Sequence, residues 1–273
     1  KSTSFSIIEV SVKEYKKFVL DYMYKEYSAG RTPNPDVLCN KFVKFGVWLE
    51  RAKKEGFEKL ATGHYARITS HVPHTKLLRD MCYVLRAAKD ENKDQTYFLH
   101  QLNQEQLSHV LFPLGDYTKP EVRELAKKFG LSTANKEESM GICFIGEVPM
   151  REFLQTRIKK KKGKITLSDG TVVGEHDGLA FYTIGQRHIG KITNSKSQIS
   201  NKLQNPNSKP LYVVGKDIKN NCLFVGHEDD VLLYKKQISV INTHWIGGHA
   251  PKMPLKCEVR IRHRQPLQKC VVE

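Results

Sequence analysis

A carboxylate and a thiol with the spacing needed for acid–base and sulfur chemistry occur in GRTPNPDVLCNKFVKFG, residues 30–46. Asp36 and Cys39 are three residues apart and follow Pro33-Asn34-Pro35 directly. Because proline cannot continue a preceding helix, we expect a new helix to begin here, with Asp36 as its N-cap. Cys39 then lies in the first turn, where the helix dipole lowers the pKa of a thiol. The pair is a candidate activated thiol beside an acid–base group.

The cysteines also have a structural interpretation, which the residues alone slightly favour. Asp36 would then only cap a helix, and Cys39 would be a buried core cysteine. Cys143 is a second candidate thiol, because Gly141 and Gly146 flank it and permit the backbone of a tight, exposed loop. Its alternative is a cysteine in a core strand. The remaining cysteines lack an acid–base neighbour and are interpreted as structural: Cys82, Cys222, Cys257 and Cys270.

Composition limits the classes of protein that the chain can belong to. Its 273 residues, 39% of them hydrophobic, suffice for one large or two to three small domains. No stretch has the length and apolarity of a membrane span, and the first residues do not form a secretory signal. The six cysteines are scattered without a CxxC pair, which favours a reducing compartment. His71 and His74 are interpreted as loop residues, and no metal site is expected.

The net charge of +16 favours a polyanionic partner such as a nucleic acid, through release of counterions. The alternative is that the charge only confers solubility. The lysine run at 159–162 is interpreted as a solvated surface rather than a specific contact.

The first half of the chain predicts an open α/β domain. We expect a strand at 5–12, a helix at 14–27, an amphipathic helix from Leu38 to Ala52 and a short strand at 59–62. We also expect an irregular insertion at 71–82, helices at 94–102 and 149–158, and a glycine-rich turn at 139–146. Two capping boxes predict further helices. Asn103/Gln106 opens one, and Thr118/Glu121 opens another that ends at Gly130.

The second half is β-rich and predicts a barrel-like unit. We expect short strands at 164–167, 171–174, 179–187, 211–215, 222–226, 237–241 and 256–264, with a flexible insertion at 193–209. A barrel ending at Val271-Val272-Glu273 leaves an unpaired edge, so the sequence suggests a truncated C-terminus.

Seven segments, in the same order, resemble the tRNA-specific 2-thiouridylases and cover nearly the whole chain. They are GRTPNPDVLCNKFVKF, ATGHYAR, KDQTYFLHQL, FPLGDYTKPEVRELA, KEESMGICFIGE, GLAFYTIGQRHIG and RIRHRQ. The first segment, together with ICFIG and KDQTYFL, is the most specific. The long segment before KDQTYFL is similar to the mitochondrial branch, and the insertion at 193–209 suggests a fungal-type member.

The resemblance implies an α/β fold in three parts. An incomplete Rossmann-like ATP-pyrophosphatase (adenine nucleotide alpha hydrolase-like) domain covers 1–147, a small β-rich central domain 148–227, and the start of a truncated β-barrel 228–273. The family's SGGxDS loop, whose backbone N–H groups hold the pyrophosphate of ATP, does not occur in this sequence. We therefore expect the printed chain to adenylate poorly. The implied location is the mitochondrial matrix, with a bacterial cytoplasm as the alternative and no membrane partner.

The resemblance also implies an activity. Family members use ATP, with Mg²⁺, to adenylate the C2 oxygen of uridine 34 in tRNAs for Lys, Glu and Gln. A persulfide sulfur, supplied by a sulfur-relay protein or a cysteine desulfurase, then replaces that oxygen. By motif, Cys143 carries the persulfide, Cys39 is the second catalytic thiol and Asp36 is the acid–base residue. The remaining implied contacts are Asn34, Pro35 and Asp36 to the target base, Gly63 to the adenine nucleotide, and His64, Lys93, Asp94, Gln95, Arg262, His263 and Gln265 to tRNA.

Other functions stay open. One is a basic RNA-binding fragment without chemistry, in which His64 only caps a turn and Lys93-Asp94 is a solvated pair. Another is a different ATP-pyrophosphatase-type enzyme that adenylates a small molecule. A dithiol oxidoreductase is disfavoured, because the cysteines are far apart in sequence and form no CxxC motif.

Overall fold

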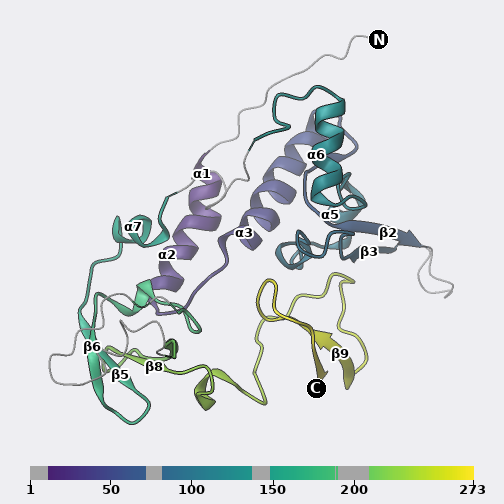
Figure 1. The fold of residues 1–273 in the computed structure, drawn as a ribbon. Helices are drawn as coiled ribbons and strands as arrows, with labels where there is room; N and C mark the ends of the chain where they lie inside the picture. The colour runs from purple at the N-terminus through teal and green to yellow at the C-terminus, as the bar shows by residue number, and fades with distance from the viewer. Residues whose placement is uncertain (1–11, 72–81, 137–147, 188, 190–208) are drawn as a thin grey trace. The chain divides into compact units, whose positions relative to one another are not determined.

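A computed structural model of the chain describes residues 12–71, 82–136, 148–187, 189 and 209–273 (Figure 1). The chain divides into two compact units. Residues 1–19, 35–139 and 242–273 belong to the first unit, and residues 20–34 and 140–241 to the second. Several predicted features lie wholly or mainly outside the described residues: the strand at 5–12, the turn at 139–146 with Cys143, and the insertions at 71–82 and 193–209.

The N-terminal helix predicted at 14–27 is confirmed as three consecutive helical stretches, α1 (Val12–Tyr15), η1 (Lys16–Leu20) and α2 (Asp21–Ser28). Gly30 follows with a positive φ of 76°, which glycine adopts without strain. Residues 31–34, which have no regular secondary structure, lead to the next helix.

A long helix follows and is drawn as a single rod in Figure 1. It comprises α3 (Pro35–Leu38), η2 (Cys39–Trp48) and α4 (Leu49–Lys54). The spacing of apolar residues predicted this helix, and Phe45 and Leu49 of the predicted stripe are buried, whereas Leu38, Phe42 and Ala52 are only partly buried. The spacing did not predict the wider π-helical turns of η2, which are rare in proteins and often occur at functional sites.

The core of the first unit lies where this helix meets two small sheets. Strand β1 (Leu60–Ala61), predicted from the sequence, pairs in parallel with β4 (Val110–Leu111). Strands β2 (Arg67–His71) and β3 (Cys82–Arg86) form an antiparallel pair. The buried cluster between these elements consists of Phe45, Ala66, Leu99, Leu102, Leu107 and Val110.

Both predicted capping boxes are present. Asn103 and Gln106 open α5 (Gln104–Ser108), and Thr118 and Glu121 open α6 (Lys119–Lys128). The prediction of a helix at 94–102 is wrong. Only a single 3₁₀ turn, η3 (Thr96–Phe98), forms in this segment.

The second unit contains α7 (Met150–Gln155) and a four-stranded sheet. The strands are β5 (Gly163–Leu167), β6 (Val172–His176), β7 (Tyr212–Asp217) and β8 (Cys222–Gly226), in the order β6-β5-β8-β7. Strand β5 pairs in parallel with β8, and the other neighbours are antiparallel. These strands confirm four of the predicted ones.

Two other predicted strands are not formed. Residues 179–187 contain only the short helix η4 (Leu179–Phe181), and residues 237–241 have no regular structure after η5 (Val231–Leu233). In the first unit, β9 (Leu255–Val259) and β10 (Gln268–Val272) form an antiparallel pair. Strand β9 is shorter than the predicted 256–264, because a loop begins at Arg260.

Candidate functional site

The segment that carries Asp36 and Cys39 forms the start of the long helix. The helix begins at Pro35, two residues before the first helical position that an Asp36 N-cap implies, so the prediction of Asp36 as the N-cap is wrong. Proline suits the first helical position, since its fixed φ matches the helix and its missing N–H would have no partner there. Asp36 therefore lies inside the first turn, where the dipole also favours a carboxylate. Cys39 is three residues on, on the same face of the helix.

Cys39 is fully buried, whereas Asn34, Pro35 and Asp36 are partly exposed. The neighbouring Asn40 donates a hydrogen bond of 3.1 Å to the backbone oxygen of Phe98, which ties the helix to the η3 segment. A reaction at the Cys39 sulfur therefore requires a local opening of this part of the chain. Cys143 lies outside the described residues, so the meeting of the two sulfurs stays a prediction.

The loop after β1 carries Gly63 and His64. The His64 ring is buried between two aromatic side chains, with centroid distances of 5.7 Å to Phe45 and 5.9 Å to Phe112. Its Nδ1 lies 2.8 Å from the Thr62 hydroxyl oxygen. Burial, followed by the nearby Lys44 charge, lowers the pKa of His64 from 6.5 to about 3, so the ring is neutral at physiological pH.

This environment fits the structural interpretation of His64 as a residue that holds a turn. Only 8% of the residue is exposed, which leaves little surface for an RNA contact. The predicted contact between His64 and tRNA is not tested and stays a prediction.

The segment Lys93–Gln95 is hydrogen bonded to this loop through Gln95 and Tyr65. The side-chain oxygen of Gln95 accepts a hydrogen bond from the Tyr65 amide, and the Gln95 amide donates to the Tyr65 carbonyl, both at 2.9 Å. Asp94 is buried, and its carboxylate accepts from the Ala88 amide at 2.7 Å and from the amide and hydroxyl of Thr96. Asp94 is therefore not half of a solvated pair, and its side chain holds the segment in shape.

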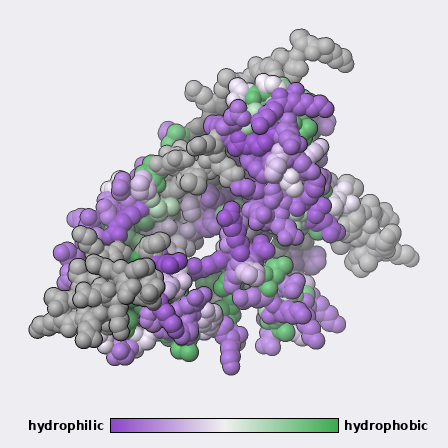
Figure 2. Space-filling view, viewed as in Figure 1, coloured by the Kyte–Doolittle hydropathy of each residue, from purple (hydrophilic) through white to green (hydrophobic). Residues whose placement is uncertain are grey.

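Three of the predicted binding residues meet in one cavity of about 460 Å³, which we call the basic cavity. It is lined by Gly63, Tyr65, Lys93, Gln95, Lys119, Val122, Arg123, Ala126, Leu131, Thr133 and Lys136. Four of these side chains are cationic and none is acidic. Helix α6 supplies Lys119 and Arg123, and its visible face is mainly hydrophilic (Figure 2).

The basic cavity has the chemistry of a phosphate-binding site. The Lys119 Nζ lies 5.8 Å from the centre of the Tyr65 ring, and Arg123 donates to the Ala134 carbonyl at 2.6 Å. A Cβ added at Gly63 would meet only Leu114, at an ordinary contact distance of 3.7 Å. The protein itself therefore does not require glycine at this position, and the bare backbone is available to a closely bound ligand.

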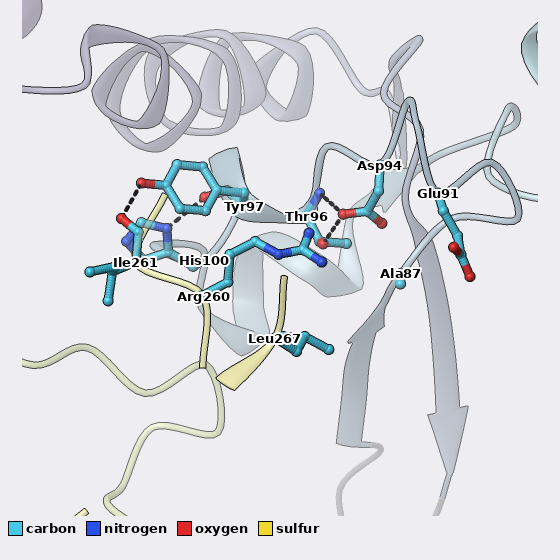
Figure 3. Close-up of a pocket in the computed structure, with 9 residues that line it drawn as sticks. All are labelled: Ala87, Glu91, Asp94, Thr96, Tyr97, His100, Arg260, Ile261 and Leu267. Atoms are coloured by element: carbon cyan, nitrogen blue, oxygen red, sulfur yellow. Dashed lines mark hydrogen bonds between the residues drawn. The ribbon is translucent and has the colours of Figure 1, made fainter. Parts of the chain in front are cut away.

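A second cavity, of about 770 Å³, lies between η3 and the loop that joins β9 to β10 (Figure 3). Its lining residues are Ala87, Glu91, Asp94, Thr96, Tyr97, His100, Arg260, Ile261 and Leu267. The Tyr97 hydroxyl donates to the Ile261 carbonyl at 3.2 Å. Figure 3 shows the Arg260 guanidinium extending toward Thr96 and Asp94.

The same loop carries the predicted residues Arg262, His263 and Gln265. The side-chain oxygen of Gln265 accepts from the amides of Ile261 and Arg262, at 3.1 and 3.2 Å, which closes the loop on itself. The His263 ring lies 4.8 Å from that of Phe98 and 5.9 Å from that of Tyr97. Burial and the adjacent arginines lower its pKa.

The structure thus brings the Gly63, Lys93–Gln95 and Arg262–Gln265 groups into one unit. Sequence reasoning assigned no role to Lys119, Arg123 and Lys136, although they lie in the matching segments FPLGDYTKPEVRELA and KEESMGICFIGE. It also missed Tyr97, which lies inside the KDQTYFL segment. No group of three or more metal-binding side chains occurs in the described part of the chain.

Comparison with known proteins agrees with this arrangement. Residues 4–147 match the family described as the tRNA methyl transferase HUP domain, 151–227 its PRC-barrel domain, and 235–273 the aminomethyltransferase beta-barrel domain. The chain therefore belongs to this family, with a Rossmann-like HUP domain of the ATP-pyrophosphatase type followed by PRC-barrel and β-barrel domains. The described β-strands do not close into a barrel.

Relatives in this family are named tRNA-specific 2-thiouridylase MnmA. The chain is 46% identical over 259 residues to the protein of Paraburkholderia phymatum, and 44% over 256 residues to MnmA 2 of Geobacillus kaustophilus. A Bacillus cereus protein is 43% identical over 263 residues. These alignments cover 94%, 93% and 96% of this chain and 63%, 63% and 65% of the relatives. Among the described residues, no helix has the length and apolarity to cross a membrane.

Proposed function

We propose that the protein to which this chain belongs is a tRNA 2-thiouridylase. It replaces the C2 oxygen of uridine 34 with sulfur in tRNAs for Lys, Glu and Gln, in a reaction that consumes ATP. The observation that carries the proposal is the basic cavity, where Gly63, Lys93 and Gln95 meet three further cations. The family and the names of its relatives support the same reaction.

ATP supplies the adenylyl group that turns the C2 oxygen into a leaving group. Gly63 and the cations of the basic cavity fit the nucleotide, because they combine a bare backbone with positive charge and no carboxylate. Lys93 and Gln95 then lie at the border between nucleotide and tRNA, and Arg262 and His263 extend the tRNA contact. The target base leaves the anticodon stack to reach Asn34, Pro35 and Asp36.

The sulfur step uses two thiols. Cys143 carries a sulfane sulfur, received from a sulfur-relay protein or a cysteine desulfurase. The Cys39 thiolate attacks the Cys143 sulfur, a Cys39–Cys143 disulfide forms, and hydrosulfide leaves to replace the activated oxygen while AMP departs. Asp36 accepts and returns the proton, and a cellular thiol restores both cysteines. We place the reaction in the mitochondrial matrix, with a bacterial cytoplasm as the alternative.

The test is mass spectrometry of tRNA nucleosides from cells that carry Cys143→Ser or Cys39→Ser in the full-length protein. We expect 2-thiouridine to be lost in both, because each variant removes one sulfur of the transfer. Cys222→Ser is the matched control and should leave the nucleoside unchanged, since Cys222 lies in strand β8 and outside the sequence motifs that carry Cys39 and Cys143. Normal 2-thiouridine in both catalytic variants would instead support an RNA-binding protein without chemistry.

A further inference from the structure

Two cysteines outside the proposed reaction face each other in the first unit. Cys257 on β9 and Cys270 on β10 are direct partners in the antiparallel register. Their sulfur atoms lie 3.5 Å apart, and both residues are unbonded and partly exposed. No sequence pattern pairs them, because they are 13 residues apart and lack a CxxC spacing.

The strand pairing already provides the geometry of a covalent bond. Partner residues in antiparallel strands have Cα atoms about 4.5 to 5.5 Å apart, which lies within the range that a disulfide spans. The pairs Lys256–Val271 and Glu258–Lys269 on either side hold the register. The two sulfurs can therefore bond after small side-chain rotations, without movement of the backbone.

We propose that Cys257 and Cys270 form a disulfide with each other when the protein meets a low-molecular-weight disulfide such as oxidised glutathione. One cysteine thiolate attacks the small disulfide, forms a mixed disulfide and releases one small thiolate. The second cysteine thiolate attacks the protein sulfur of that mixed disulfide and expels the other small thiolate. The cysteines lose two electrons and two protons, and the small disulfide gains both.

The environment of the pair affects how fast it reacts. The contact with Cys257, with burial second, raises the pKa of Cys270, so less of this thiol is ionised at neutral pH and the exchange is expected to be faster in mildly alkaline solution. No third metal-binding side chain joins them in the described part of the chain. The sulfurs are thus arranged for a bond with each other rather than for a metal ion.

The bond would close the loop that carries Arg262, His263 and Gln265. Strands β9 and β10 flank this loop, and a disulfide between them would hold its two ends together. This consequence for tRNA binding rests on the proposed function, whereas formation of the disulfide does not.

The experiment treats the full chain with oxidised glutathione, blocks the remaining thiols with iodoacetamide and maps the peptides without reduction. We expect a peptide pair joined through Cys257 and Cys270, lighter by two hydrogens, with both cysteines unavailable to iodoacetamide. Reduction should restore both alkylations. Because the peptides come from the wild-type chain, misfolding of a variant cannot affect this result.

Two variants make the assignment specific. Cys82→Ser, which removes another partly exposed cysteine, should leave the joined peptides unchanged. Cys270→Ser should abolish them and leave Cys257 alkylated or bound to one glutathione. The proposal is overturned if both cysteines of the wild-type chain are alkylated, if each carries its own glutathione, or if either is joined to Cys39 or Cys143. Loss of 2-thiouridine activity would not alter this readout.

Discussion

At the scale of a single residue, His64 shows how burial sets the protonation state beside the basic cavity. Its pKa falls from 6.5 to about 3 because the ring lies between Phe45 and Phe112, away from water. The unfolded chain takes up this proton near pH 6.5, whereas the folded chain does not. Between these two pKa values the unfolded state binds more protons, so the contribution of His64 to stability is complete above pH 6.5 and decreases as the pH falls toward 3.

We therefore expect the free energy of unfolding to decrease with acidification below pH 6.5. The contribution of His64 should approach about 1.4 kcal/mol per pH unit, the value of one proton. Urea unfolding of the wild-type chain and of His64→Leu, from neutral pH to about pH 5, measures the difference in slope. His249→Asn, at an exposed position, is the control and should keep the wild-type slope. Equal slopes in the wild type and His64→Leu would contradict this account.

At the scale of secondary-structure elements, strand β7 holds the segment that leads to Asn34. Lys216 Nζ donates a hydrogen bond of 2.8 Å to the Gly30 carbonyl. A Cβ on Gly30 would clash with Ile218, at 2.3 Å, so the backbone lies directly against this side chain. The hydroxyls of Thr32 and Thr183 are 3.1 Å apart. These contacts lie within the second unit and fix the chain just before the predicted target-base residues.

Lys216→Met should loosen this segment while leaving the fold intact. The variant keeps the aliphatic chain and loses one hydrogen bond, so amide exchange at residues 30–32 should accelerate about fivefold, equivalent to about 1 kcal/mol. Global stability should change little, because the loss of the hydrogen bond is offset. Burial of the Lys216 amine is unfavourable, as its pKa of about 8 indicates, and the variant removes that amine. Hydrogen-exchange mass spectrometry measures both effects. Lys219→Met, at an exposed turn, is the control, and unchanged exchange in Lys216→Met would contradict a positioning role.

The elements that the sequence predicted well are those with local causes. The Thr118/Glu121 box opens α6 because its hydrogen bonds join neighbouring residues. The helix predicted at 94–102 failed because Asp94 bonds back to the Ala88 backbone and Gln95 bonds to the Tyr65 backbone, 30 residues away, and helical spacing encodes neither contact. The strand predicted at 237–241 has suitable residues but no pairing partner among the described strands.

The candidate site divides in the same way. Motif resemblance selected Gly63, Lys93 and Gln95, and the structure places all three on the basic cavity. Lys119 and Lys136 lie in the matching segments FPLGDYTKPEVRELA and KEESMGICFIGE but were not selected, because only the folded chain makes them neighbours of Gly63 and Lys93. Cys257 and Cys270 were missed for a related reason, since strand register rather than motif spacing brings them together.

At the scale of the whole molecule, the net charge of +16 should dominate the affinity for tRNA. Each lysine or arginine that meets a phosphate releases a counterion, so added salt opposes binding. The basic cavity is lined by Lys93, Lys119, Arg123 and Lys136, and none of its described lining residues is acidic. We therefore expect this cavity to contact phosphates, in contrast to Lys53, which pairs with Glu105 at 3.0 Å.

We expect the affinity of the full chain for tRNA to fall about a hundredfold between about 50 and 200 mM salt, as for roughly four to five phosphate contacts. Filter binding or fluorescence anisotropy across this range gives the slope of log affinity against log salt. Lys136→Ala should weaken binding and reduce the slope by about one contact. Lys53→Ala should change neither, because Lys53 already pairs with Glu50 and Glu105. A slope near zero, or equal effects of the two variants, would show that the charge serves solubility and that the cavity does not bind the tRNA backbone.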